Sequence, residues 1–469
     1  MRDTVERKRG PRALRGLRLA AATAALALLA ASLPAAAAEQ NLTEALATTY
    51  RTNPTLAAAR AELRAVNEQV PQALSNWRPR VTLQGDVGEQ YIDSFGSDGE
   101  ATTPRSVELD VTQPLYRGGR TEAETKRAEA LVRAQRAVLH DVEQQVLLSA
   151  SIAYMDVWRD QSVLELTINN EQVLARQLEA SQDRFEVGEV TRTDVAQSES
   201  RLARATSERI EAEGNLSISR AIYQEVVGIF PGVLEAPPRV ENLPESVLAL
   251  TAMAQERNPL VVSSSFTEKS ERANIRLQIG ELLPELSLVG TLSHSEDTTS
   301  RTSETQRGQI LARLSVPIYQ QGFVSSQIRE AKQRRSQRLL ETDEARRRAV
   351  QDSTSAWEAL QTARAEIASF ESEVSSTDIA LEGVRQENAV GARTVLDILD
   401  AEQEFLDAQV NLVTARRDEI VASYQVLTAM GQMTAQSLDL PVEIYDPAAD
   451  LEKVRDRWWG FGGFRPEPE

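Results

Sequence analysis

The sequence contains no cysteine and only two histidines, His140 and His294. The missing thiols exclude disulfide bonds and thiolate metal sites, and two histidines leave little for acid–base catalysis or metal binding. No nucleophile–base pair, phosphate-binding loop or metal-ligand spacing is found in the sequence. We therefore expect no enzyme activity, no cofactor and no metal site.

Long hydrophobic runs are also scarce. The longest, residues 19–33, is shorter than the roughly 20 residues that a spanning helix requires. A basic segment precedes this run, and an Ala-x-Ala signal at residues 36–38 follows it, so we predict a signal peptide over residues 1–38. A retained anchor is the alternative interpretation. If the exported chain is integral to a membrane, it must span it as a β-barrel.

Basic residues are outnumbered by acidic ones, which gives a net charge of −18. Residues 1–38 carry seven basic and two acidic side chains, so their removal takes the net charge from −18 to −23. Such a surface repels nucleic acid, and it favours cations if the acids line a pore.

The chain contains an internal repeat of about 200 residues. Four ordered markers recur at offsets of 203 to 205 residues, which makes coincidence a poor explanation. The markers are Asn53-Pro54 with Asn258-Pro259, Pro79 with Pro284, the Pro-[Leu/Ile]-Tyr-x-x-Gly segments 114–119 and 317–322, and the Val-Gly-x-x-Thr segments 187–191 and 390–394.

Each copy contains two segments in which apolar and polar residues alternate, at about 80–92 and 105–116 and again at about 285–294 and 307–319. Period-2 segments of about ten residues are typical of membrane β-strands with one lipid face and one wet face. A half-buried hairpin of a soluble protein is the alternative for either pair taken alone.

Long helices without proline follow the strands, at 119–187 and 322–389. Apolar residues recur at heptad spacing in both helices, which indicates coiled-coil packing. The first seam comprises Val157, Leu164 and Leu178 and is interrupted at Glu171, and the second comprises Leu360, Ile367, Val374 and Leu381. Shorter helices return at 192–228 and 394–430. Helices before the strands, at about 56–77 and 261–283, have the length to stack on the returning helices, with a kink expected at Pro71.

We expect a mixed α and β membrane protein with a two-fold sequence repeat. Four strands cannot close a barrel, whereas three chains supply twelve, enough to enclose water. The predicted layout comprises the first repeat at 39–230, an equatorial connection at 231–257, the second repeat at 258–431, and an equatorial segment with a mobile tail at 432–469.

The markers and their duplicated order resemble the TolC family of outer-membrane efflux and secretion proteins over nearly the whole mature chain. The most specific stretch is Gly391-Ala-Arg-Thr-Val-Leu-Asp397-Ile-Leu-Asp400. The resemblance implies a homotrimer with a 12-stranded barrel in the outer membrane and a coiled-coil tunnel that extends into the periplasm. It also implies a periplasmic adaptor (membrane fusion) protein and an inner-membrane transporter of RND or ABC type as partners.

Asp397 and Asp400 lie three residues apart on one helix face, and in a trimer they would form two rings of carboxylates at the periplasmic gate. For Asp397, helix capping is an equal alternative, because Asp194 occupies the matching place in the first copy. Gln197 is the counterpart of Asp400, so capping does not explain Asp400.

The resemblance also places Arg393 against Thr193 and Asp194 as a latch that holds the gate shut. The family's tyrosine in this latch falls at Asn388, which weakens or replaces that link. A solvated surface arginine is the alternative. Adaptor hairpins are expected to dock at the helical tips. The alternative is that the geometry of the tight turns alone requires the residues found there, and both interpretations can hold together. The tip residues are Val187, Gly188, Thr191, Val390, Gly391 and Thr394.

The preferred function is a passive exit duct of a tripartite efflux pump or type I secretion system, conducting drugs, small molecules or proteins. The alternative is a soluble periplasmic coiled-coil scaffold or adaptor. An adaptor normally has one helical hairpin, whereas this sequence predicts two hairpins and four strands with a lipid pattern.

Overall fold

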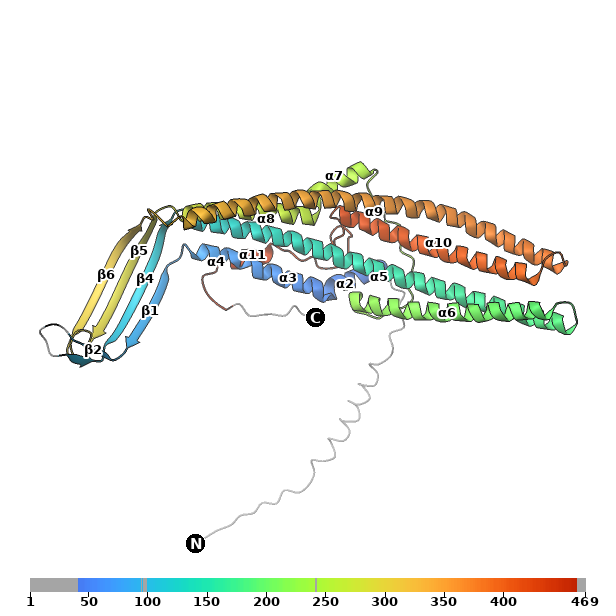
Figure 1. Ribbon diagram of the computed structural model, residues 1–469, viewed down its shortest axis with the longest axis horizontal. Helices are drawn as coiled ribbons and strands as arrows, with labels where there is room; N and C mark the ends of the chain where they lie inside the picture. The colour runs from blue at the N-terminus through green and yellow to red at the C-terminus, as the bar shows by residue number, and fades with distance from the viewer. Residues whose placement is uncertain (1–40, 94, 96–98, 241–242, 462–469) are drawn as a thin grey trace, which may run out of the picture.

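The computed structural model describes residues 41–93, 95, 99–240 and 243–461, so the predicted signal peptide lies outside the described part of the chain. The molecule is elongated, with a β-sheet at one end and the tips of two helical hairpins at the other (Figure 1). The long helices run the whole distance between these ends (Figure 1).

Both copies of the repeat fold in the same order. The first copy comprises α2 (Leu42–Thr52), α3 (Pro54–Asn67), α4 (Gln69–Ser75), β1 (Arg80–Val87), β2 (Gln90–Ile92), β3 (Glu100–Thr102), β4 (Arg105–Arg117), α5 (Arg120–Glu186) and α6 (Arg192–Val227). The second comprises α7 (Val247–Arg257), α8 (Pro259–Gly280), β5 (Glu285–Glu296), β6 (Glu304–Ser315), α9 (Phe323–Ala389) and α10 (Val395–Ala429), and α11 (Ala449–Val454) follows.

The four long strands form one antiparallel sheet in the order β1-β4-β5-β6. The two copies meet at the β4–β5 pair, and β1 and β6 form the edges of the sheet. The register aligns Leu83 with Leu109, Leu109 with Leu292, and Leu292 with Gly308. Side chains alternate between the faces of a strand, so the predicted apolar residues share one face of the sheet.

That face is exposed in the single chain. Val81, Leu83, Ile310 and Leu314 are each more than 60% accessible. The opposite face carries polar side chains, and Thr291 Oγ1 donates a hydrogen bond of 2.7 Å to Asp110 Oδ1 across the β4–β5 pair.

Two predicted strands differ from those in the structure. The first strand, expected over 80–92, divides into β1 and the short β2, because β1 pairs with β4 only as far as Val87 opposite Arg105. The last strand, expected over 307–319, runs from Glu304 to Ser315. Its partner β5 begins at Glu285 opposite Ser315, so residues 316–319 have no strand to pair with.

The long helices pack through the predicted seams. Val157, Leu360, Ile367 and Leu381 are buried. Glu171 stands in the first seam where the second has a valine, and its carboxylate is held by α6, with Arg209 Nε at 2.6 Å and Thr206 Oγ1 at 2.7 Å. An ion pair therefore replaces an apolar contact at this level.

The Asn-Pro markers join two short helices into one rod beside each long helix. Asn53 Oδ1 accepts from the backbone of Thr55 at 2.9 Å and caps α3, while Asn53 Nδ2 donates to Val226 O at the end of α6. Asn258 joins α10 to α8 in the same way. Its Nδ2 donates a hydrogen bond to Ala429 O, and its Oδ1 accepts one from Leu260 N. One amide thus satisfies the ends of two helices.

A break at Glu68 separates α3 from α4, whereas α8 is continuous. Pro71 lies three residues beyond the break and has no amide to donate back to the preceding turn, which accounts for the interruption.

The largest hydrophobic core lies midway along the rod, where α2, α5, α6, α10 and the segment after α10 meet. Tyr154 and Tyr223 are fully buried there, and Tyr154 donates to Glu235 O at 2.8 Å. Beyond this core, α11 packs against α3, where Asn67 Nδ2 donates to Asp450 Oδ2 at 3.0 Å. None of the described helices combines the length and the apolar character needed to cross a membrane.

Candidate functional site

The sites expected from the sequence gather at the hairpin tips, far from the sheet (Figure 1). The first hairpin consists of α5 and α6, and the second of α9 and α10. Both tips use the same backbone geometry. Gly188 and Gly391 have φ angles of 82° and 79°, in the left-handed region that favours glycine. A Cβ at either glycine would meet nothing within 4 Å, so conformation rather than packing requires glycine there.

Hydrogen bonds close both tips in a Schellman motif. Glu189 N donates to Arg184 O and Gly188 N to Phe185 O, and the amides of Ala392 and Gly391 repeat the pattern in the second hairpin.

Asp194 and Asp397 belong to capping boxes at the starts of α6 and α10. In the second box, Asp397 Oδ2 accepts from Thr394 N at 2.8 Å and from Thr394 Oγ1 at 2.7 Å. The hydroxyl of Thr394, then its backbone amide and the nearby Arg393 guanidinium, hold the pKa of Asp397 below its ordinary value. Asp397 is therefore a charged helix cap in the single chain.

Asp400 has a different environment. Its carboxylate forms an ion pair with Arg201 of α6, so the contact joins the second hairpin to the first. The Asp400 side chain remains 52% exposed and the Arg201 side chain 27%. The sequence reasoning missed Arg201, although it lies four residues after Gln197, the counterpart of Asp400, and so on the same helix face.

A second polar contact between the hairpins involves the position of the family tyrosine. Asn388 Oδ1 accepts from Arg184 Nη1 of α5 at 3.4 Å. Arg184 and Asn388 thus join the two hairpins by a guanidinium–amide hydrogen bond. Arg184 was also missed, because nothing in its local sequence identifies a partner 204 residues away.

The expected latch residues do not meet within one chain. Arg393 pairs with Glu387 at 2.9 Å and lies 3.8 Å from Asp397, so both of its ion pairs stay inside the second hairpin. Thr193 is exposed on α6, and Asp194 is engaged in its own cap.

A small apolar cluster lies just above the tips. Leu399 and Val395 of α10 pack with Leu174 of α5 and with Ala205 and Leu202 of α6. Apart from this cluster, α10 packs mainly on α9 and α5 and only marginally on α6. The hairpins thus meet near the tips through few contacts.

The tips also expose apolar side chains. Val187 is 72% and Val390 81% accessible, and each immediately precedes a tip glycine. Thr191 and Thr394 are the helix caps that follow. Each hairpin tip therefore exposes one valine side chain at an equivalent position, at the end of the molecule away from the sheet.

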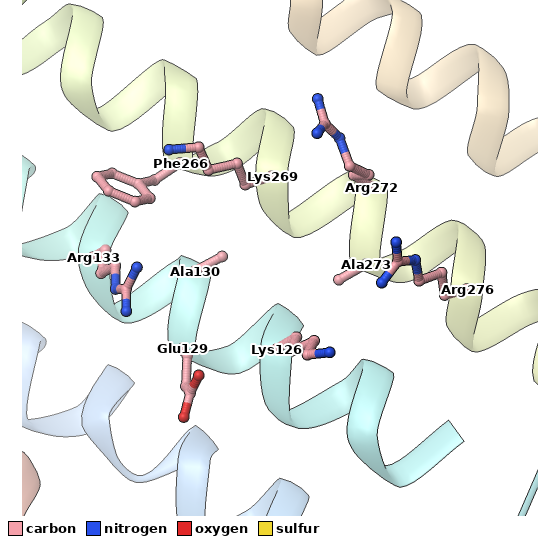
Figure 2. Close-up of a pocket in the computed structure, with 9 residues that line it drawn as sticks. All are labelled: Lys126, Glu129, Ala130, Arg133, Phe266, Lys269, Arg272, Ala273 and Arg276. Atoms are coloured by element: carbon pink, nitrogen blue, oxygen red, sulfur yellow. The ribbon is translucent and has the colours of Figure 1, made fainter. Parts of the chain in front are cut away.

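A groove of about 250 Å³ lies between α5 and α8 (Figure 2). Lys126 pairs with Glu122 and Arg272 with Glu268. The cationic groups of Arg133 and Lys269 lie over the Phe266 ring, 5.8 Å and 4.2 Å from its centroid. We assign this groove to helix packing. It is lined by Lys126, Glu129, Ala130, Arg133, Phe266, Lys269, Arg272, Ala273 and Arg276. Among the described residues, no group of three or more His, Cys, Asp or Glu side chains is arranged to hold a metal ion.

Comparison with known proteins bears on this architecture. The model of the outer membrane efflux protein family matches residues 48–228 and 250–432, which correspond to the two copies of the repeat. The chain is 33% identical over 428 residues to the outer membrane efflux protein BepC of Brucella suis biovar 1 (strain 1330), covering 91% of this chain and 93% of the relative. It is 26% identical over 418 residues to the outer membrane protein TolC of Escherichia coli (strain K12), covering 85% and 84%.

The fold is also found among solved structures. The Campylobacter jejuni CmeC outer membrane channel matches with a TM-score of 0.76 at 14% identity, over 88% of this chain and 89% of that one. These findings favour the duct over the soluble scaffold. The chain belongs to the outer membrane efflux protein family, and it is an exit duct of the outer membrane that extends into the periplasm.

Proposed function

We propose that three copies of this chain close a twelve-stranded barrel that continues into a helical tunnel. The main support for this proposal is the four-stranded sheet, which exposes an apolar face and has β1 and β6 as its edge strands. Open strand edges are not tolerated in lipid, because each unpaired backbone group there costs several kcal/mol. Pairing β6 of one subunit with β1 of the next satisfies both edges.

The gate of this duct is formed by the second hairpin at its periplasmic end. Asp397 and Asp400 supply two rings of carboxylates that attract cations. Arg201 neutralises the Asp400 ring in part, so the first hairpin both tethers the second and reduces its negative charge. The latch of Arg393 with Thr193 and Asp194 forms between neighbouring subunits, since these residues do not meet within one chain.

The exposed tips are the docking points for a periplasmic adaptor. Val187 and Val390 provide apolar contact, while Gly188 and Gly391 keep the turns tight and free of side chains that would obstruct a partner helix. An inner-membrane transporter of RND or ABC type supplies the energy, because the duct itself conducts passively. The cargo comprises drugs, small molecules or proteins of an efflux pump or a type I secretion system.

Size and conductance of the purified protein test this proposal together. We expect the protein to require detergent for extraction, to have the mass of a trimer by light scattering, and to conduct ions in planar bilayers with a preference for cations. A monomer that stays in the soluble periplasmic fraction and carries no current would contradict the proposal.

A further inference from the structure

The C-terminal segment beyond α11 carries three aromatic residues that the duct does not use. Trp458 is 68% and Trp459 89% accessible, and Phe461 is fully exposed. Aromatics make up only 5% of this chain, so three exposed within four positions form a distinct apolar patch. We call residues 458, 459 and 461 the aromatic patch.

Contacts of Arg78 hold the first residue of this patch beside the base of the sheet. Arg78 Nη1 donates to Arg457 O at 2.7 Å, and the Arg78 guanidinium lies over the Trp458 ring, 5.0 Å from its centroid. Arg78 precedes the first residue of β1, Arg80, by two positions, which is at most about 7 Å of chain. Figure 1 shows α11 beside α4, at the sheet end of the helical rod.

The base of the sheet is where lipid gives way to water in the proposed duct. Trp77, two residues before the Pro79 marker, is itself 44% exposed, and its carbonyl accepts from Gln113 of β4 at 2.9 Å. The aromatic patch thus lies next to the lower end of the apolar face that starts with Val81 and Leu83. Tryptophan is enriched at this depth in membrane proteins, because its ring prefers the headgroup region.

The charges around the patch match phospholipid headgroups. Arg78 lies over the Trp458 ring, Arg457 directly precedes that ring in the chain, and Arg80 begins β1 two residues after Arg78, in a chain whose overall charge is strongly negative. Arginines below an apolar aromatic group can bind lipid phosphates while the rings lie among the upper acyl carbons.

We propose that the aromatic patch is an interfacial anchor that inserts into the periplasmic leaflet of the outer membrane. Its ligand is the phospholipid surface, bound by Trp458, Trp459 and Phe461 with the adjacent arginines. This inference rests on the proposed function, since it requires the sheet to lie in lipid. Adaptor docking at the hairpin tips would not cover this patch, because the tips are at the opposite end of the molecule (Figure 1).

Tryptophan quenching by brominated lipid tests the anchor. The five tryptophans of the chain allow a tail reporter in which Trp77, Trp158 and Trp357 are replaced by Phe, so that Trp458 and Trp459 alone emit. The protein is reconstituted in nanodiscs of phosphatidylcholine with or without bromine at acyl positions near the headgroup. We expect quenching of about two-fold or more with the brominated lipid, since the rings would lie at that depth.

Two matched reporters separate the anchor from the duct. A variant that keeps only Trp158, which packs against the equatorial core, should not be quenched. A Leu83→Trp variant without the natural tryptophans places the probe on the apolar face of β1 and reports whether the sheet lies in lipid. If the three-fold replacement prevents folding, the W458F/W459F double variant serves instead, because it should reduce the quenchable fraction of the wild-type emission to that of Trp77 at the base of the sheet.

Quenching at Leu83→Trp without quenching of the tail reporter would overturn the anchor and leave the duct standing. The same holds for tail emission that is blue-shifted but insensitive to bromine, since the patch would then be covered by a neighbouring subunit. If neither reporter is quenched, the proposed duct itself is wrong.

Discussion

The ion pair between Arg201 and Asp400 gives the sharpest prediction about gating. It connects α6 of the first hairpin to α10 of the second, near the tips, where the hairpins also meet through a small apolar cluster and the Arg184–Asn388 hydrogen bond. We expect Arg201→Gln to loosen the second hairpin and to increase the population of open ducts, because the amide retains the size of the side chain but not its charge.

The magnitude follows from the exposure of the two groups. Side chains that are 27% and 52% accessible form a partly solvated pair, worth about 0.3–1 kcal/mol. Three such pairs in the proposed trimer add about 1–3 kcal/mol, which changes the ratio of open to closed ducts about 5- to 150-fold. The apolar cluster of Leu174, Ala205 and Leu399 is unchanged in this variant, so the duct should still be able to close.

Single-channel recording in planar bilayers measures this ratio directly. Asp400→Asn should have an effect of similar size, and the double variant should add little to either, because both changes remove one interaction. Arg209→Gln is the matched control, since Arg209 forms its ion pairs with Glu171 and Glu213, both inside the first hairpin, and is buried to a similar extent as Arg201.

Divalent cations provide a second measurement on the same variants. Arg201→Gln exposes the Asp400 carboxylates and should strengthen block from the periplasmic side, whereas the double variant should not. The reasoning would be refuted if Arg201→Gln left both open probability and block at wild-type values, or if Arg209→Gln had the same effect.

Further predictions concern the turns and the latch. Gly431→Ala should lower the melting temperature more than Gly188→Ala, because both glycines have left-handed backbones costing about 1–2 kcal/mol for alanine, but a Cβ at 431 also lies 2.8 Å from Arg257 O. Arg393→Ser should raise conductance if the latch crosses subunits, and an unchanged closed state would argue against it. The pKa of Asp397 is lowered, so the stability that its helix cap contributes is present at neutral pH and is lost only as pH falls through that lowered value. Conductance at pH 5 should therefore match conductance at pH 7, and a clear difference between the two would contradict this role of Asp397.

Features that depend on a few neighbouring residues were accessible from the sequence. The tip glycines, the threonine caps and the capping-box aspartates are local, since each hydrogen bond spans five residues or fewer. The alternation of apolar residues likewise predicted one face of the sheet, because the side-chain period of a strand is fixed.

Features that depend on distant partners were not accessible. Arg201 and Asp400 are 199 residues apart, and Arg78 lies 379 residues from the carbonyl that it binds. The end of β6 was misplaced for the same reason, because it is set by where β5 begins rather than by the sequence of β6. The resemblance suggested the partners of Arg393, whereas the single chain places Glu387 and Asp397 beside it.

Disulfide crosslinking between edge strands tests the trimeric barrel most directly, and the cysteine-free sequence gives a clean background. Within one chain, Leu83 of β1 and Gly308 of β6 are separated by β4 and β5, so three strand spacings put them about 14 Å apart, beyond the roughly 7 Å limit of a disulfide. Leu83→Cys is combined in turn with cysteine at positions 306, 308, 310 and 312. The account predicts a covalent trimer on non-reducing gels for at least one pair and none for the single variants; monomers throughout the set would contradict it.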